Sequence, residues 1–143
     1  MKILNQQIFE NREAAALPGL MESGGLPALV SGLSGIHRVN LAAALYERLE
    51  LPLLIVCPDD SAAESFSRDL EAMTGEKVNT LYSRDFTFYS SLAASREAEQ
   101  KRLYVLNALR CGESPLTVAT VSALMQRTIP PQTLIKAAIT AKD

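Results

Sequence analysis

The chain has 143 residues, of which 48% are apolar and 21% are charged, with 14 basic side chains against 16 acidic ones. This composition predicts one globular domain with a hydrophobic core and argues against intrinsic disorder. A formal net charge of −2 argues against strongly electrostatic binding of nucleic acid. No apolar run approaches the roughly 20 residues of a membrane-spanning helix, and no signal peptide is visible, so we expect a soluble, cytoplasmic domain with no membrane partner.

Helical and strand patterns alternate along the chain, and the strand-like runs are continuously apolar, which is typical of strands buried on both faces. In chain order we expect a helix over 5–16 that Pro18 and Gly19 end, a strand over 26–33, a helix over 38–49, a strand over 51–57 and a helix over 61–73. We then expect a strand over 77–82, a loop over 83–94, a helix over 95–111 and a strand over 114–121. The last expected element is a short helix over 123–127 that begins after Ser122.

This alternation predicts an α/β fold, a three-layer arrangement in which a four-stranded parallel sheet has helices on both faces. Right-handed crossovers place the carboxyl ends of all parallel strands at one edge of such a sheet. Ligands bind at that edge in this architecture, so the loops that follow the strands are the places to search for a site.

The loop after the first expected strand can be compared with the phosphate-binding pattern G-x-x-x-x-G-K-[ST]. Gly32 fills the first glycine, whereas His37 stands at the second glycine. Arg38 stands at the lysine and Val39 at the Ser/Thr position, so the magnesium-binding hydroxyl is missing. Two interpretations stay open: Gly32 and Gly35 make an ordinary tight turn, or the loop is a decayed nucleotide site. Under both we expect no nucleotide hydrolysis and no bound cofactor here.

The two cysteines, Cys57 and Cys111, are too few for a disulfide framework, and we expect both to be buried free thiols. A thiol nucleophile needs a base such as histidine, and the one histidine of the chain is His37. A structural metal site needs about four ligands. We therefore expect no catalytic residues and no metal site.

Two acidic residues, Asp59 and Asp60, follow the strand over 51–57. Such a pair can bind a metal ion or cap the following helix, and we favour capping because carboxylates stabilise the amino end of a helix. Ser61 and Glu64 have the S-x-x-E spacing of a capping box.

Four aromatic residues, Tyr82, Phe86, Phe88 and Tyr89, gather in and beside the expected loop over 83–94. One interpretation is contact with a partner protein or stacking on nucleic-acid bases, for which Phe86, Phe88 and Tyr89 are the candidates. The other is that the rings attach a long loop to its own domain.

Basic residues of the helix over 95–111 alternate with acidic ones. We interpret Arg96, Lys101 and Arg102, which alternate with Glu97 and Glu99, as a solvated helix face. Such a face gives no support to a nucleic-acid interface.

Three stretches carry a family resemblance: GLSGIHRV followed by LPLLIVCPDDSAAESFSRDL, then SRDFTFYSSLAASREAEQKRLYVLNAL, then LTVATVSALMQRTIPP. Together they resemble the amino-terminal module of the bacterial transcription-repair coupling factor family, Mfd, over roughly residues 1–135. That module is similar to the first domain of UvrB, which keeps an intact phosphate loop. The resemblance implies a P-loop NTPase-like, helicase-like fold with a degenerate phosphate loop at Gly32, Gly35, His37, Arg38 and Val39.

The resemblance also implies a function. Proteins of this family displace RNA polymerase stalled at DNA damage with an ATP-driven DNA translocase located elsewhere in the chain, and they recruit UvrA mainly through a small inserted domain. Residues 1–133 would form a partial UvrB-like domain, and residues 134–143 would begin the inserted domain with a strand. The implied partners are the rest of the parent chain, UvrA, RNA polymerase and DNA, and no cofactor is expected for this part.

Two other functions stay open. An active UvrB-like, ATP-dependent helicase domain would have to tolerate His37, Arg38 and Val39, and it would need a second acidic motif that this sequence lacks. A generic α/β domain that binds a small ligand would need a closed pocket at the carboxyl ends of the strands.

Overall fold

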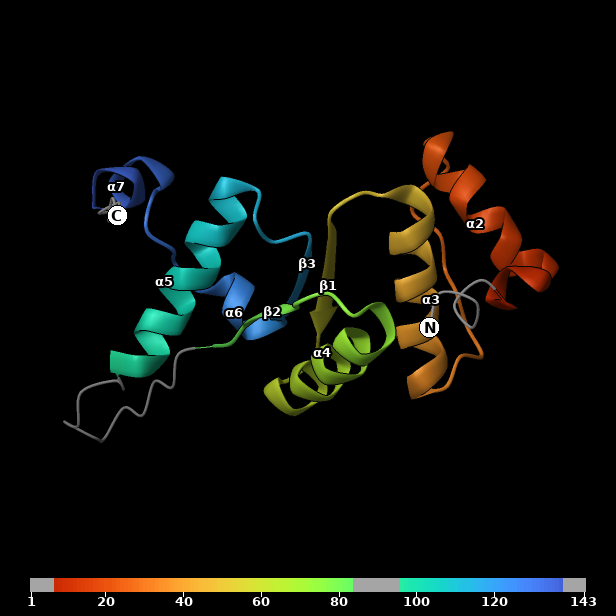
Figure 1. Cartoon of the computed structure of the whole chain (residues 1–143), viewed down its shortest axis with the longest axis horizontal. Helices are drawn as coiled ribbons and strands as arrows, with labels where there is room; N and C mark the ends of the chain where they lie inside the picture. Colours follow the sequence, from red (N-terminus) through yellow and green to blue (C-terminus); the bar gives the residue numbers. More distant parts are fainter. Residues whose placement is uncertain (1–6, 84–95, 138–143) are drawn as a thin grey trace.

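Three parallel strands form the sheet in the computed structural model, which describes residues 7–83 and 96–137. They are β1 (Leu53–Cys57), β2 (Asn79–Leu81) and β3 (Leu116–Thr120), in the order β1-β3-β2 (Figure 1). The central strand β3 pairs with β1 along its whole length and with β2 over all of that shorter strand. Each of β1 and β2 therefore has one edge without a strand partner in the described part of the chain.

Helices cover both faces of this sheet. They are the 3-10 turn η1 (Ile8–Glu10) and the helices α2 (Arg12–Glu22), α3 (Gly35–Leu49), α4 (Asp60–Thr74), α5 (Arg96–Cys111), α6 (Val121–Met125) and α7 (Pro131–Ala137). The helices α3 and α4 lie on one side of the sheet and α5 on the other (Figure 1). The predicted α/β class, with a parallel sheet between helices, is confirmed.

The larger of the two hydrophobic clusters in the core joins α3 and α4 to the sheet. Its buried members come from α3, β1, α4, the approach to β2, and β3: Val39, Ala43, Cys57, Ala63, Leu70, Val78, Leu116 and Val118. A smaller cluster on the other face joins Leu81, Val105, Ala119 and Ala123 from β2, α5, β3 and α6. The two faces are covered unequally, since neither cluster includes the outward-facing side chains of β1.

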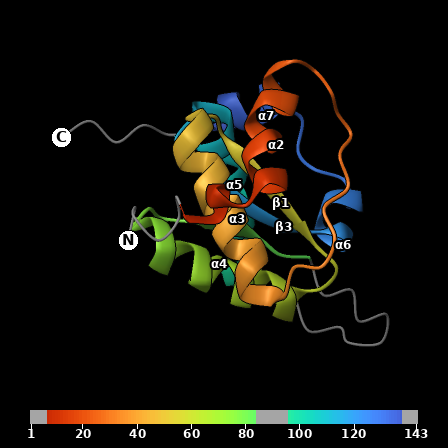
Figure 2. The same cartoon turned by 90° about the vertical axis from the view of Figure 1, so that its right-hand side faces the viewer.

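The expected strand over 26–33 is absent, so the sheet has three described strands and not the predicted four. These residues form an extended segment on the outside of the molecule that joins α2 to α3 (Figure 2). The Leu29 side chain is 94% exposed. A strand needs a neighbouring strand for its backbone hydrogen bonds, and no described strand pairs with this segment.

The amino-terminal helix differs from the prediction of one helix over 5–16 that stops at Pro18. The side chain of Asn11 accepts hydrogen bonds from the backbone N–H groups of Glu13 (2.9 Å) and Ala14 (3.3 Å), so α2 begins after it. The helix then continues through Pro18, which is buried. The stop expected at Pro18 was wrong because capping at Asn11 sets where α2 begins and the helix then accommodates the proline.

The carboxyl-terminal part is helical. The prediction that the stretch from residue 134 begins with a strand is wrong within the described residues, because Pro131–Ala137 forms α7, with a proline in the first turn where its missing N–H is harmless. The residue that caps the preceding short helix also differs from the prediction. Thr120 and not Ser122 caps α6, since Thr120 Oγ1 accepts the N–H of Ala123 at 3.1 Å.

Candidate functional site at the amino end of helix α3

A glycine turn leads into α3. Gly32 has a φ of +80°, in the left-handed region that glycine adopts at little cost. A Cβ placed there would meet no atom within 4 Å, so backbone conformation and not crowding favours glycine. Gly35 is the first residue of α3, and the preceding Ser34 occupies the cap position in an extended conformation.

The side chain of His37 contacts the residue at the cap position. Its Nδ1 lies 2.9 Å from Ser34 Oγ, and both residues are exposed. The Ser34 hydroxyl makes no capping hydrogen bond to the backbone. The two side chains therefore occupy the first turn of α3, where a phosphate loop would leave room for a ligand.

Arg38 extends back over the segment before the helix. Its Nε donates a hydrogen bond to the carbonyl oxygen of Leu33 at 3.2 Å. The guanidinium is at the surface, and the first turn of α3 holds no acidic residue. The positive charge thus stands beside the loop without an acidic neighbour in that turn.

Val39 points away from the loop. Its side chain is only 2% exposed and belongs to the core that Ala43 and Cys57 share. The structure therefore brings Gly32, Gly35, His37 and Arg38 together at the amino end of α3, and it places the Val39 side chain in the core, away from them.

This arrangement supports limited chemistry. The first N–H groups of any α-helix lack partners within the helix, so the turn presents donors and one guanidinium to an anion. One hydroxyl meets an imidazole here, Ser34 Oγ with His37 Nδ1 at 2.9 Å, and both side chains lie exposed at the surface. No three His, Cys, Asp or Glu side chains come together as a metal site among residues 7–83 and 96–137.

The two cysteines lie in different environments. Cys57 is buried, as predicted, and its burial, together with the nearby carboxylate of Asp59, raises the pKa of the thiol. Cys111 is exposed, so the prediction that it is buried was wrong. It stands at the last position of α5, where Gly112 ends the helix with a φ of +72° and turns the chain at the surface.

Helix capping is confirmed for the acidic pair. Asp59 Oδ1 accepts the N–H of Ala62 at 2.8 Å, and α4 begins at Asp60. The capping box expected from Ser61 and Glu64 does not form at the cap, because Ser61 already lies inside the first turn of α4.

Of the aromatic candidates, only Tyr82 can be placed, and it is exposed. Phe86, Phe88 and Tyr89 lie outside the described residues. The hypothesis that they contact a partner stays a prediction.

The prediction that Arg102 lies on a solvated helix face was wrong. Arg102 is 4% exposed and not part of a solvated face. One guanidinium nitrogen donates to the Tyr82 carbonyl and another to the Ala123 carbonyl, each at 3.0 Å. Its spacing from the buried Val105 and Ala108 follows the apolar face of α5, which is the signal that predicts its burial.

By fold, the chain is an α/β protein with a small parallel sheet and a glycine turn into the helix that precedes β1. It is 32% identical over 125 residues to the transcription-repair-coupling factor of Bacillus subtilis (strain 168). The match covers 87% of this chain but 10% of that relative, so the chain spans about a tenth of its length. This similarity indicates a relationship to part of a transcription-repair-coupling factor.

No family model matches the chain, and no solved structure matches it. Within the described ranges, none of the helices combines the length and the apolar character needed to cross a bilayer.

Proposed function

We propose that this chain is the amino-terminal, non-catalytic module of a transcription-repair coupling factor and acts in transcription-coupled nucleotide-excision repair. The observation that carries the proposal is the 32% identity to the Bacillus subtilis protein over 87% of the chain. Because the match covers 10% of that relative, the ATP-driven translocase and the RNA polymerase and DNA contacts would belong to other parts of a longer protein.

The residues at the start of α3 support the non-catalytic part of this proposal. A magnesium nucleotide needs a hydroxyl ligand and open backbone donors in the first turn. Val39 is buried in the core, and the Ser34 hydroxyl contacts the ring of His37. These residues do not fit a magnesium nucleotide, so the module would serve as a scaffold without ATP hydrolysis.

The open side of β1 supports the proposal that residues 1–133 are part of a larger domain. The Leu54 and Val56 side chains are 54% and 50% exposed, although parallel sheets are normally covered on both faces. We propose that a further segment of the longer protein covers them. With that segment in place, the module would support UvrA recruitment and regulation of the translocase by acting as a scaffold for the segment.

The repair role can be tested with a chimera. The matching segment of the Bacillus subtilis coupling factor is replaced by this chain, and a strain lacking that segment is the control. We expect the chimera to bind UvrA in a pull-down and to restore faster repair of the transcribed strand after ultraviolet irradiation. A chimera that is stably expressed and repairs no better than the deletion strain contradicts the proposed role.

The absence of nucleotide binding has a separate test. Titration of the chain with a fluorescent ATP analogue and Mg²⁺ is expected to show no saturation below about 1 mM, which corresponds to about −4 kcal/mol. Saturation at micromolar concentration that Arg38→Ala abolishes would favour an active UvrB-like domain. Arg68→Ala, an exposed arginine on α4, is the matched control.

One observation favours small-ligand binding as a second candidate. A groove of about 470 Å³ lies between α2 and residues 28–33, and aliphatic side chains such as Leu17, Leu20 and Leu41 line it. No strand residue lines this groove, so it is not the closed pocket at the carboxyl ends of the strands that this function was expected to need. Native mass spectrometry of the purified chain tests this candidate. A small molecule that is retained, and then lost in Leu41→Asn, would support it.

A further inference from the structure

We draw no further inference here: the strongest candidate, the apolar face of β1 that carries the half-exposed Leu54 and Val56, belongs to the surface already described, and nothing in the described residues shows what covers it.

Discussion

The two outer strands of the sheet, β1 and β2, differ in how far the described chain packs against them. At β2, side-chain contacts join the strand and its flanks to neighbouring helices, among them Ser67 with Thr80, Lys77 with Tyr104, and Arg102 with the Tyr82 carbonyl. At β1, Leu54 and Val56 are half exposed, and no described element covers them. Side chains of the described chain thus tie β2 to its neighbouring helices, whereas one face of β1 is left exposed.

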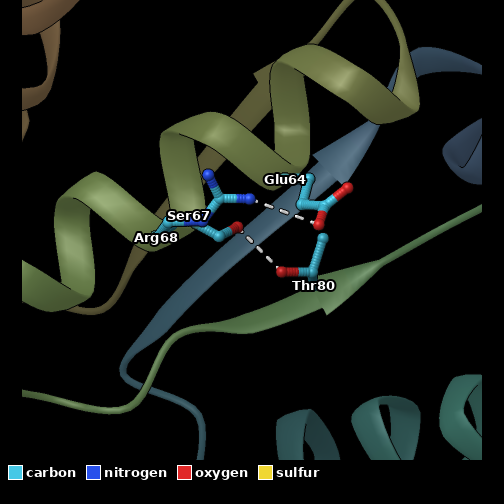
Figure 3. Close-up of polar contacts among 4 residues, drawn as sticks. All are labelled: Glu64, Ser67, Arg68 and Thr80. Carbon is cyan, nitrogen blue, oxygen red and sulfur yellow. Dashed lines mark hydrogen bonds and ion pairs between the residues drawn. The ribbon is translucent and has the colours of Figure 1, made fainter.

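The contact between α4 and β2 shows how the β2 edge is fixed. Ser67 and Thr80 meet through their hydroxyl groups at 2.7 Å (Figure 3). The neighbouring Arg68–Glu64 ion pair, at 3.4 Å, lies on the exposed side of α4. An exposed pair within one helix contributes little; α4 is joined to β2 by the Ser67–Thr80 contact and by Glu71, whose carboxylate accepts the N–H of Val78 at 2.9 Å.

The largest expected difference between the edges concerns leucine truncation. Leu81→Ala removes a side chain that is 3% exposed, and it should lower the free energy of unfolding by about 3 kcal/mol. Leu54→Ala, on the open face of β1, should cost less than about 1 kcal/mol, because that side chain remains half in water. Urea denaturation measures both variants. Equal losses would mean that β1 is covered as well as β2.

Removal of the buried arginine should have the next largest effect. Arg102→Met leaves the carbonyl oxygens of Tyr82 and Ala123 without these donors, and it should cost about 2 kcal/mol. Gln100→Met, an exposed change on the same helix, is the control and should be nearly neutral. If both variants have the same unfolding midpoint in urea, Arg102 does not stabilise the β2 edge.

The covered face of β1 can be probed through its cysteine. Because the pKa of the Cys57 thiol is raised above its ordinary value near 9.0, the folded state favours the neutral thiol. The contribution of Cys57 to stability is therefore complete below about pH 9 and is lost as the pH rises through the folded-state pKa.

Iodoacetamide at about pH 8 should modify the exposed Cys111 at least about tenfold faster than Cys57. Mass spectrometry of tryptic peptides measures the two rates. Comparable rates in the folded protein would show that the covered face of β1 opens readily.

The smallest expected effect on stability comes from a charge on the open face. Val56→Lys should change the free energy of unfolding by less than about 0.5 kcal/mol, because half of the side chain is already exposed. It should, however, reduce self-association, since lysine at an edge strand discourages pairing between copies. Sedimentation velocity at increasing concentration compares the variant with the unmodified chain. An unmodified chain that stays fully monomeric would contradict the expectation that β1 promotes association between copies.

Local signals predicted most of the elements. The helices α3, α4 and α5 follow from their apolar spacing, and Gly75 and Gly112 end two of them with left-handed backbone angles. The strand β1 follows from a continuous apolar run, whereas the β2 and β3 segments, also predicted as strands, contain polar residues. These features depend on residues close together in the sequence, which is why they can be predicted without knowledge of the fold.

Features that depend on distant partners were harder to predict. Residues 26–33 have the composition of a buried strand, but pairing requires a neighbour that the described residues do not provide. Arg102 was expected in water because arginine is rarely buried, and its two carbonyl partners come from separate parts of the chain. Val39 stands at the Ser/Thr position of the phosphate-loop pattern, but its helical spacing from Ala43 places it on the core side of α3.

The extended segment over 26–33 also has a practical consequence. No backbone hydrogen bond joins residues 26–32 to other described residues, and Leu29 lies almost wholly in water. Thermolysin, which cuts before large aliphatic residues, should therefore cleave within this segment and release η1 and α2 from a piece that retains α3 and the three described strands. Such a cleavage would separate the part of the chain that forms the sheet from η1 and α2, which pack on α3 and contribute no strand.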